Sequence, residues 1–151
     1  TTVTGVQTCA LPILRKTELL NRIATLLGGR AAEEIIFSDI STGAHNDLAR
    51  ATDIARSMIK EYGMSATMGQ VYLAREKRAR FMDTGLEPVG EYSEATSEMI
   101  DREIREIISR QYETALSILR GKKDALEKGA RLLLEKETIE GEEIKKLFEV
   151  V

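Results

Sequence analysis

The chain has few of the residues from which compact protein sites are often built. Its 151 residues include one cysteine, one histidine, two prolines and no tryptophan. A single cysteine excludes an internal disulfide framework, and without a C-x-x-C or Cys/His cluster there is no motif for a sulfur-ligated zinc. The sequence also lacks the phosphate-binding loop G-x-x-x-x-G-K-[ST], so we expect no ATPase module of that type in this chain.

A large excess of positive or of negative charge is likewise missing. Charged residues make up 31% of the chain and hydrophobic ones 42%, with a net charge of −3, which suits a globular or helical-bundle protein. Lysines and arginines are interspersed with aspartates and glutamates, so no basic stripe predicts a nucleic-acid partner. No apolar run approaches the ~20 residues that span a bilayer. We therefore expect no nucleic-acid binding and no membrane crossing within this segment.

Residues 1–13 differ in kind from the rest. They contain no charged residue, whereas every Lys, Arg, Asp and Glu lies from Arg15 onward. They lack both helical periodicity and the basic and apolar regions of a signal peptide. Residues 3–13, V-T-G-V-Q-T-C-A-L-P-I, resemble the translation of a common sequencing-library adapter, and a disordered natural tail is the alternative. The prediction is a non-native or disordered leader at 1–13 and a domain at 14–151.

The remaining chain has the periodicity of helices. The expected helices cover residues 17–27, 31–37, 45–62, 93–120 and 122–136. Gly28 and Gly29 are predicted to end the first, because glycine takes the left-handed C-terminal position without steric cost. Ser93 is a predicted cap for the long helix, and Thr138 for a last helix that reaches Phe148.

Two segments are expected to be non-helical. Residues 71–74 are the best candidate for a strand, and it is short. Residues 76–91 are charged, contain glycines and a proline, and predict a loop. The predicted fold is therefore all-α, with at most one short edge strand.

The residues that bear on chemistry are concentrated in 26–48. This stretch reads L-L-G-G-R-A-A-E-E-I-I-F-S-D-I-S-T-G-A-H-N-D-L, with an acidic pair at Glu33 and Glu34 and a second motif around Asp47. A carboxylate at the start of a helix can be a metal ligand, because packing along the helix holds it in place. Far more often, such an aspartate is a cap or a partner of the helix dipole.

The motifs, taken in order, resemble the protease domain of the membrane-anchored AAA+ zinc metalloproteases, the FtsH-type peptidase family M41. The resemblance covers roughly residues 14–148 and includes L-G-G-R-A-A-E-E, S-T-G-A-H-N-D-L, A-x-x-I-A-R-S-M-I and Y-G-M-S. It implies that Asp47 is the third protein ligand of a catalytic zinc, and that Thr42 and Gly43 shape the turn presenting it. It also implies that Glu33 lies near the metal and orients a ligand. The alternative for Glu33 is a carboxylate at a helix N-terminus, favourable to the dipole.

The family's other zinc ligands come from an upstream H-E-x-x-H helix that also carries the catalytic glutamate. This chain has no such motif, and its one histidine is His45. Side chains two residues apart on a helix point about 200° apart, so His45 is expected to be a surface residue rather than a co-ligand of Asp47. We therefore expect no catalytic residue in this chain and no activity from it alone.

The resemblance implies that the intact parent is an ATP-dependent zinc metalloendopeptidase that degrades unfolded membrane and soluble proteins. Zinc would belong to this domain, and ATP and magnesium to a missing ATPase module. The parent would be a homo-hexamer that takes polypeptide substrates. Missing N-terminal helices would hold it on the cytoplasmic face of a bacterial inner membrane, or on an organelle membrane of bacterial descent. The alternative is a non-catalytic interaction module that oligomerises through the long helix, with Asp47 only a cap.

Overall fold

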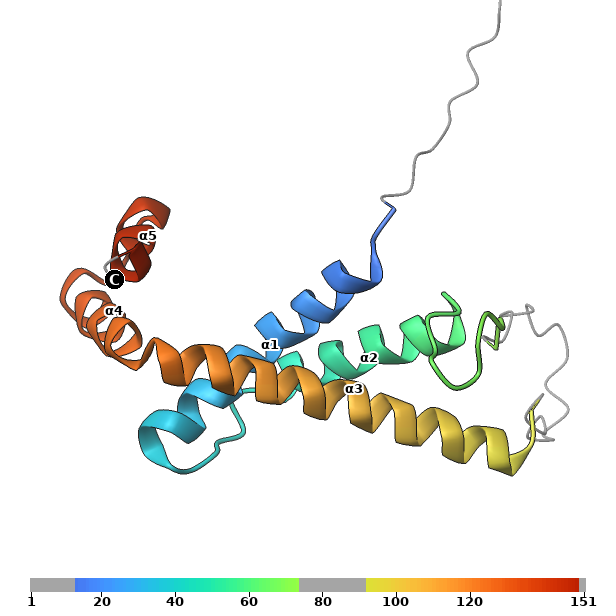
Figure 1. Ribbon diagram of the computed structural model, residues 1–151. Coiled ribbons are helices and arrows are strands. Elements are labelled where there is room, and N and C mark those ends of the chain that lie inside the picture. The colour runs from blue at the N-terminus through green and yellow to red at the C-terminus, as the bar shows by residue number, and fades with distance from the viewer. Residues whose placement is uncertain (1–12, 74–91, 150–151) are drawn as a thin grey trace, which may run out of the picture.

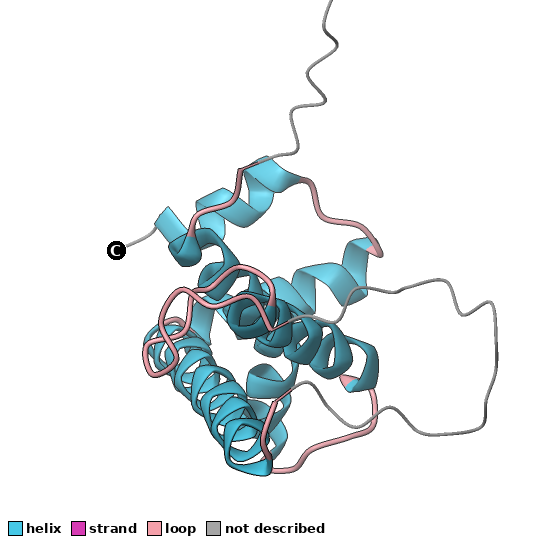
Figure 2. Ribbon diagram, turned by 90° about the vertical axis from the view of Figure 1, so that its right-hand side faces the viewer, coloured by secondary structure: helices cyan, strands magenta, loops and turns pink. Residues whose placement is uncertain are grey.

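The computed structural model describes residues 13–73 and 92–149, and within these ranges the chain forms five helices and no strand (Figure 2). The helices are α1 (Lys16–Phe37), α2 (His45–Lys60), α3 (Glu94–Gly121), α4 (Lys123–Lys136) and α5 (Gly141–Glu149). The all-α prediction is confirmed. None of the helices that the structure describes has an apolar stretch of the length that a bilayer crossing requires.

Helices α1, α2 and α3 pack against one another, while α4 and α5 lie beyond the C-terminal end of α3 (Figure 1). The three-helix core contains Ile23 of α1 and Met58 of α2, both with no exposed surface, and Ile100 of α3. Burying each large apolar side chain contributes about 1.5–3 kcal/mol. The core therefore fixes α1 against α2, and with them the loop that joins the two helices.

α1 does not end at Gly28 and Gly29, so the predicted helix stop is wrong and residues 31–37 are not a separate helix. The helix runs without a break to Phe37, and Ser38 follows in the left-handed conformation (φ 53°, ψ 26°). Each helical glycine costs about 1 kcal/mol relative to alanine. Leu27 and Ala31, which flank the glycine pair, are buried in the core, and this burial outweighs the local propensity.

Other boundaries follow their local chemistry. Ser93 caps α3 as predicted, because its Oγ accepts a hydrogen bond from the Thr96 amide at 3.3 Å. The last helix begins at Gly141, so Thr138 lies too early to cap it. The Glu140 carbonyl instead accepts the first bonds of α5, from the amides of Glu143 and Ile144.

The strand candidate is wrong over residues 71–73, which are irregular. There the Leu73 amide donates to the Lys60 carbonyl at 2.7 Å, so this segment satisfies the end of α2 instead of pairing in a sheet. Ala74 and the predicted loop at 76–91 lie outside the described residues. So do residues 1–12, and the predicted leader stays a prediction.

Candidate metal-ligand site

Residues 38–44 join α1 to α2, and we call them the α1–α2 turn. Backbone hydrogen bonds lead from this turn into the helix: the His45 amide donates to the Thr42 carbonyl at 3.1 Å, and the Leu48 amide to the Ala44 carbonyl at 2.9 Å. Ala44, the last residue of the turn, is buried. These hydrogen bonds therefore hold the first turn of α2 to the α1–α2 turn.

Asp47 lies in this first turn of α2 and is partly exposed. The N-cap position belongs to Ala44, and the helix has no side-chain cap, so Asp47 does not act as one. In the part of the chain that the structure describes, no group donates a hydrogen bond to its carboxylate. Four and eight residues further along, Ala51 and Ala55 are fully buried in the core, and they hold α2 in place behind Asp47.

Glu33 contacts the α1–α2 turn. Its Oε1 accepts a hydrogen bond from the Ser41 hydroxyl at 2.6 Å, and its Oε2 accepts one from the Ser41 amide at 3.2 Å. These two bonds, the hydroxyl first, lower the pKa of Glu33 because they stabilise its charged form. Glu33 lies near the C-terminal end of the continuous α1, where a carboxylate opposes the helix dipole, so the alternative interpretation as an N-terminal carboxylate is wrong.

Gly43 and Thr42 both belong to the turn. The Gly43 amide donates to Ser41 Oγ at 3.1 Å. A Cβ at Gly43 would lie 3.2 Å from Ser41 Oγ and 3.6 Å from Glu33 Oε1, a close approach that favours glycine. Thr42 contributes its backbone carbonyl, which accepts from His45.

Sequence reasoning missed two residues of this arrangement, Arg30 and Ser41. Arg30 Nη1 donates to the Ser41 carbonyl at 2.7 Å, whereas Glu33 accepts from the Ser41 amide and hydroxyl. Arg30 and Glu33 are three residues apart and share one helical face because Arg30 is itself part of α1, whereas the predicted short helix began at residue 31. The predicted helix stop at Gly28 concealed that relation.

The described residues cannot hold zinc by themselves. In 13–73 and 92–149, no group of three or more His, Cys, Asp and Glu side chains is placed to bind a metal ion. His45 is exposed, as expected. Asp47 could therefore supply one ligand, and the remaining ligands would have to come from elsewhere.

Two other carboxylates serve the packing of the helices. The Tyr112 hydroxyl donates to Glu34 Oε2 at 2.6 Å and ties α3 to α1; burial, and then this bond, raise the pKa of Tyr112 to about 12. Glu103 is buried on α3 and accepts from the Ser65 hydroxyl (2.6 Å) and the Ala66 amide (2.7 Å). Both contacts join segments far apart in the sequence.

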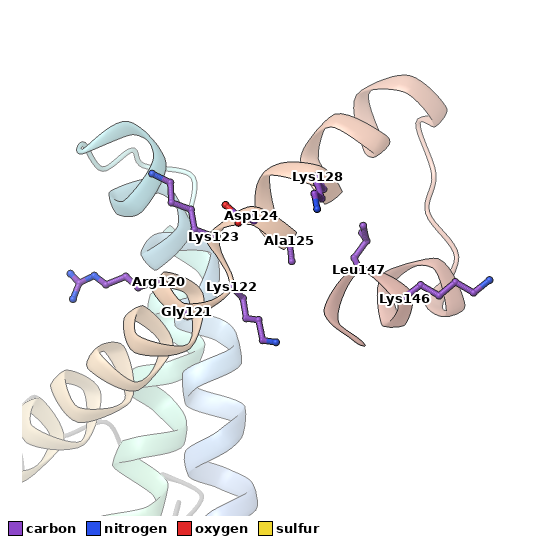
Figure 3. Close-up of a pocket in the computed structure, with 9 residues that line it drawn as sticks. All are labelled: Arg120, Gly121, Lys122, Lys123, Asp124, Ala125, Lys128, Lys146 and Leu147. Carbon is purple, nitrogen blue, oxygen red and sulfur yellow. The ribbon is translucent and has the colours of Figure 1, made fainter. Parts of the chain in front are cut away.

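A basic concavity of about 290 Å³ lies where α3 meets α4 and α5 (Figure 3). Its cationic side chains point in different directions: Arg120 and Lys146 extend away from each other. Lys122 is directed toward α5, where its Nζ donates to the Phe148 carbonyl at 3.4 Å. This concavity therefore lacks the converging charges of an anion site.

Comparison of the sequence with known families places the chain among the peptidases. The model of peptidase family M41 matches residues 7–147, and the chain belongs to this family.

The chain is also similar to curated proteins that are named ATP-dependent zinc metalloproteases. The chain is 48% identical over 140 residues to the ATP-dependent zinc metalloprotease FtsH of Syntrophobacter fumaroxidans. The alignment covers 92% of this chain and 22% of that protein. The chain is 46% identical to FtsH 4 of a Synechocystis species, over 90% of this chain and 22% of the relative. It is 40% identical to FtsH of Thermotoga maritima, with the same coverage of both. The chain thus spans about a fifth of the length of these relatives.

Proposed function

We propose that this chain is the C-terminal part of the protease domain of an ATP-dependent zinc metalloendopeptidase. The main support for this proposal is the similarity, over about nine-tenths of the chain, to relatives named ATP-dependent zinc metalloproteases. The parent protein would hydrolyse internal peptide bonds of unfolded membrane and soluble polypeptides. It would act as a homo-hexamer anchored by helices outside this chain, on the cytoplasmic face of a bacterial inner membrane or on an organelle membrane of bacterial descent.

Asp47 is the zinc ligand that this chain contributes. A bound zinc lowers the pKa of its water ligand and polarises the scissile carbonyl. Asp47 supports this role because α2 is held by its buried face while the carboxylate stays partly exposed, without a partner in the described residues. Two histidine ligands and the general-base glutamate would come from an H-E-x-x-H helix outside this chain, and ATP and magnesium from a further module.

The chain alone is therefore inactive. It holds one histidine, so it cannot supply the His pair of such a site. The purified 151-residue chain should cleave no casein above background, whether zinc is added or chelated. Chelator-sensitive cleavage by this chain would contradict the proposed division of the site.

Sequencing the genomic reading frame upstream of Leu14 is the simplest test of the proposal. An H-E-x-x-H motif some tens of residues before Leu14, preceded by an ATPase module, is the expected result. A frame that lacks both would contradict the proposed protease and favour the interaction module.

A further inference from the structure

Four hydrogen bonds converge on Ser41, and we call them the Ser41 clasp. The Ser41 carbonyl accepts from Arg30 Nη1 at 2.7 Å, and its amide donates to Glu33 Oε2 at 3.2 Å. Its hydroxyl donates to Glu33 Oε1 at 2.6 Å and accepts from the Gly43 amide at 3.1 Å. Every polar group of this exposed residue is thus bonded to the protein.

Water could satisfy the polar groups of a residue on an exposed turn, but those of Ser41 are bonded to protein groups instead. Bonds to an ionised arginine or glutamate are roughly twice as strong as neutral ones. Both charged partners come from α1, on either side of Ala31, which is fully buried against α3. The turn is therefore attached to a part of the helix that cannot easily move.

Successive hydrogen bonds connect the clasp with the first turn of α2, which carries Asp47. The Gly43 amide donates to the Ser41 hydroxyl. The His45 amide donates to the Thr42 carbonyl, and the Leu48 amide to the Ala44 carbonyl. In the described structure Asp47 has no side-chain hydrogen bond of its own, so its direction depends on the backbone of the turn and of the first turn of α2.

We propose that Ser41 is a positioning residue for Asp47, and that Arg30 and Glu33 act on the metal ligand through Ser41. The clasp sets the angle at which α2 starts and so the place of the Asp47 carboxylate. The inference about the turn stands on these contacts alone; the inference about zinc rests on the proposed function. In this proposal Glu33 holds Ser41 by hydrogen bonds and does not itself contact a zinc-binding side chain.

Two variants of Ser41 separate the hydroxyl from the packing. Ser41→Ala removes the hydroxyl bonds to Glu33 and Gly43, whereas Ser41→Thr keeps a hydroxyl. Ser57→Ala is the matched control, because the Ser57 hydroxyl also donates to a glutamate, Glu61 (3.0 Å), but within α2 and away from the turn. Circular dichroism and thermal unfolding report whether each variant folds.

Amide hydrogen exchange in the 151-residue chain tests the clasp without metal. We expect exchange at Gly43 to rise on the order of 10-fold in Ser41→Ala, because its amide loses its acceptor. Exchange at His45, which bonds to the Thr42 carbonyl, should also rise because the turn is no longer held. Exchange in Ser41→Thr and Ser57→Ala should stay near the wild-type rate. Unchanged exchange in Ser41→Ala would overturn the proposal.

Zinc titration of the longer protein, which carries the upstream histidines, tests the link to the ligand. Removing a residue that orients a ligand typically lowers metal affinity about 10–100-fold, and this is the result expected for Ser41→Ala, with rescue by Ser41→Thr. Equal zinc affinity in Ser41→Ala and Ser57→Ala would overturn the positioning role. Failure of the wild-type protein to bind zinc would overturn the proposed function and the zinc part of this inference, while the exchange result would still decide the clasp.

Discussion

Glu33 and Asp47 are carboxylates on neighbouring helices, yet their surroundings differ. Glu33 accepts two hydrogen bonds from Ser41, whereas no group in the described parts of the chain donates one to Asp47. A carboxylate that is already bonded to a serine is committed to the turn, and one that is free to accept new partners can take a metal ion. The environment of each residue, and not its type, therefore separates the two proposed roles.

The lowered pKa of Glu33 predicts a pH dependence. A carboxyl whose folded pKa lies below its ordinary value, about 4.3, stabilises the fold above that value. This stabilisation is lost as the pH falls through the folded pKa. Glu33→Gln should therefore lower the thermal unfolding midpoint at neutral pH, and the difference from wild type should shrink in acid. A difference that is constant from pH 7 to about pH 3 would contradict this.

Tyr112→Phe should destabilise the chain by about 1–2 kcal/mol at neutral pH, because it removes the bond to Glu34 and keeps the ring. The raised pKa of Tyr112 means that this stabilisation is present below the ordinary tyrosine value of about 10 and is lost as the pH rises through about 12. Urea unfolding of both proteins measures the difference. Equal stability at neutral pH would show that the bond contributes nothing.

At the scale of the elements, the Ser41 clasp depends on the length of α1. Its continuation past Gly28 brings Arg30 and Glu33 onto the face that binds Ser41. The helix periodicity of α2 and α3 could be predicted because their apolar residues recur on one face. The continuity of α1 could not, because the local preference of two glycines is outweighed by burial of Leu27 and Ala31, which depends on helices distant in the sequence.

Gly28→Ala should therefore stabilise the chain by about 0.5–1 kcal/mol, because alanine is the better helix former and a Cβ there meets nothing within 4 Å. Gly63→Ala is the contrasting variant, since Gly63 has φ +60° and a Cβ would lie 3.2 Å from the Gln70 Cα. It should destabilise by about 1–3 kcal/mol. Thermal unfolding compares the two, and a destabilising Gly28→Ala would favour the helix stop after all.

At the scale of the whole molecule, the three-helix core determines where the α1–α2 turn lies. All-α architecture and the position of Asp47 at the start of a helix could be predicted, because both follow from local pattern. The Ser41 clasp could not, because it joins residues from a helix and a turn whose distance in space depends on the packing of the core.

Ile23→Ala should cost about 2–5 kcal/mol, because it leaves a cavity at a position with no exposed surface. Leu134→Ala is its control, since Leu134 of α4 is 85% exposed and its truncation should change stability by less than about 0.5 kcal/mol. Denaturant unfolding measures both. Similar losses for the two variants would contradict the core described here.

Asp47→Asn in the longer protein tests the central claim most directly. Asparagine keeps the size of the side chain and removes the negative charge with which a carboxylate binds zinc, so we expect loss of bound zinc and of ATP-dependent, chelator-sensitive casein cleavage by at least about 100-fold. Thermal unfolding of the metal-free proteins should differ little, because Asp47 is partly exposed and has no hydrogen-bond donor among the described residues. An Asp47→Asn protein that keeps its zinc and its cleavage would contradict the account.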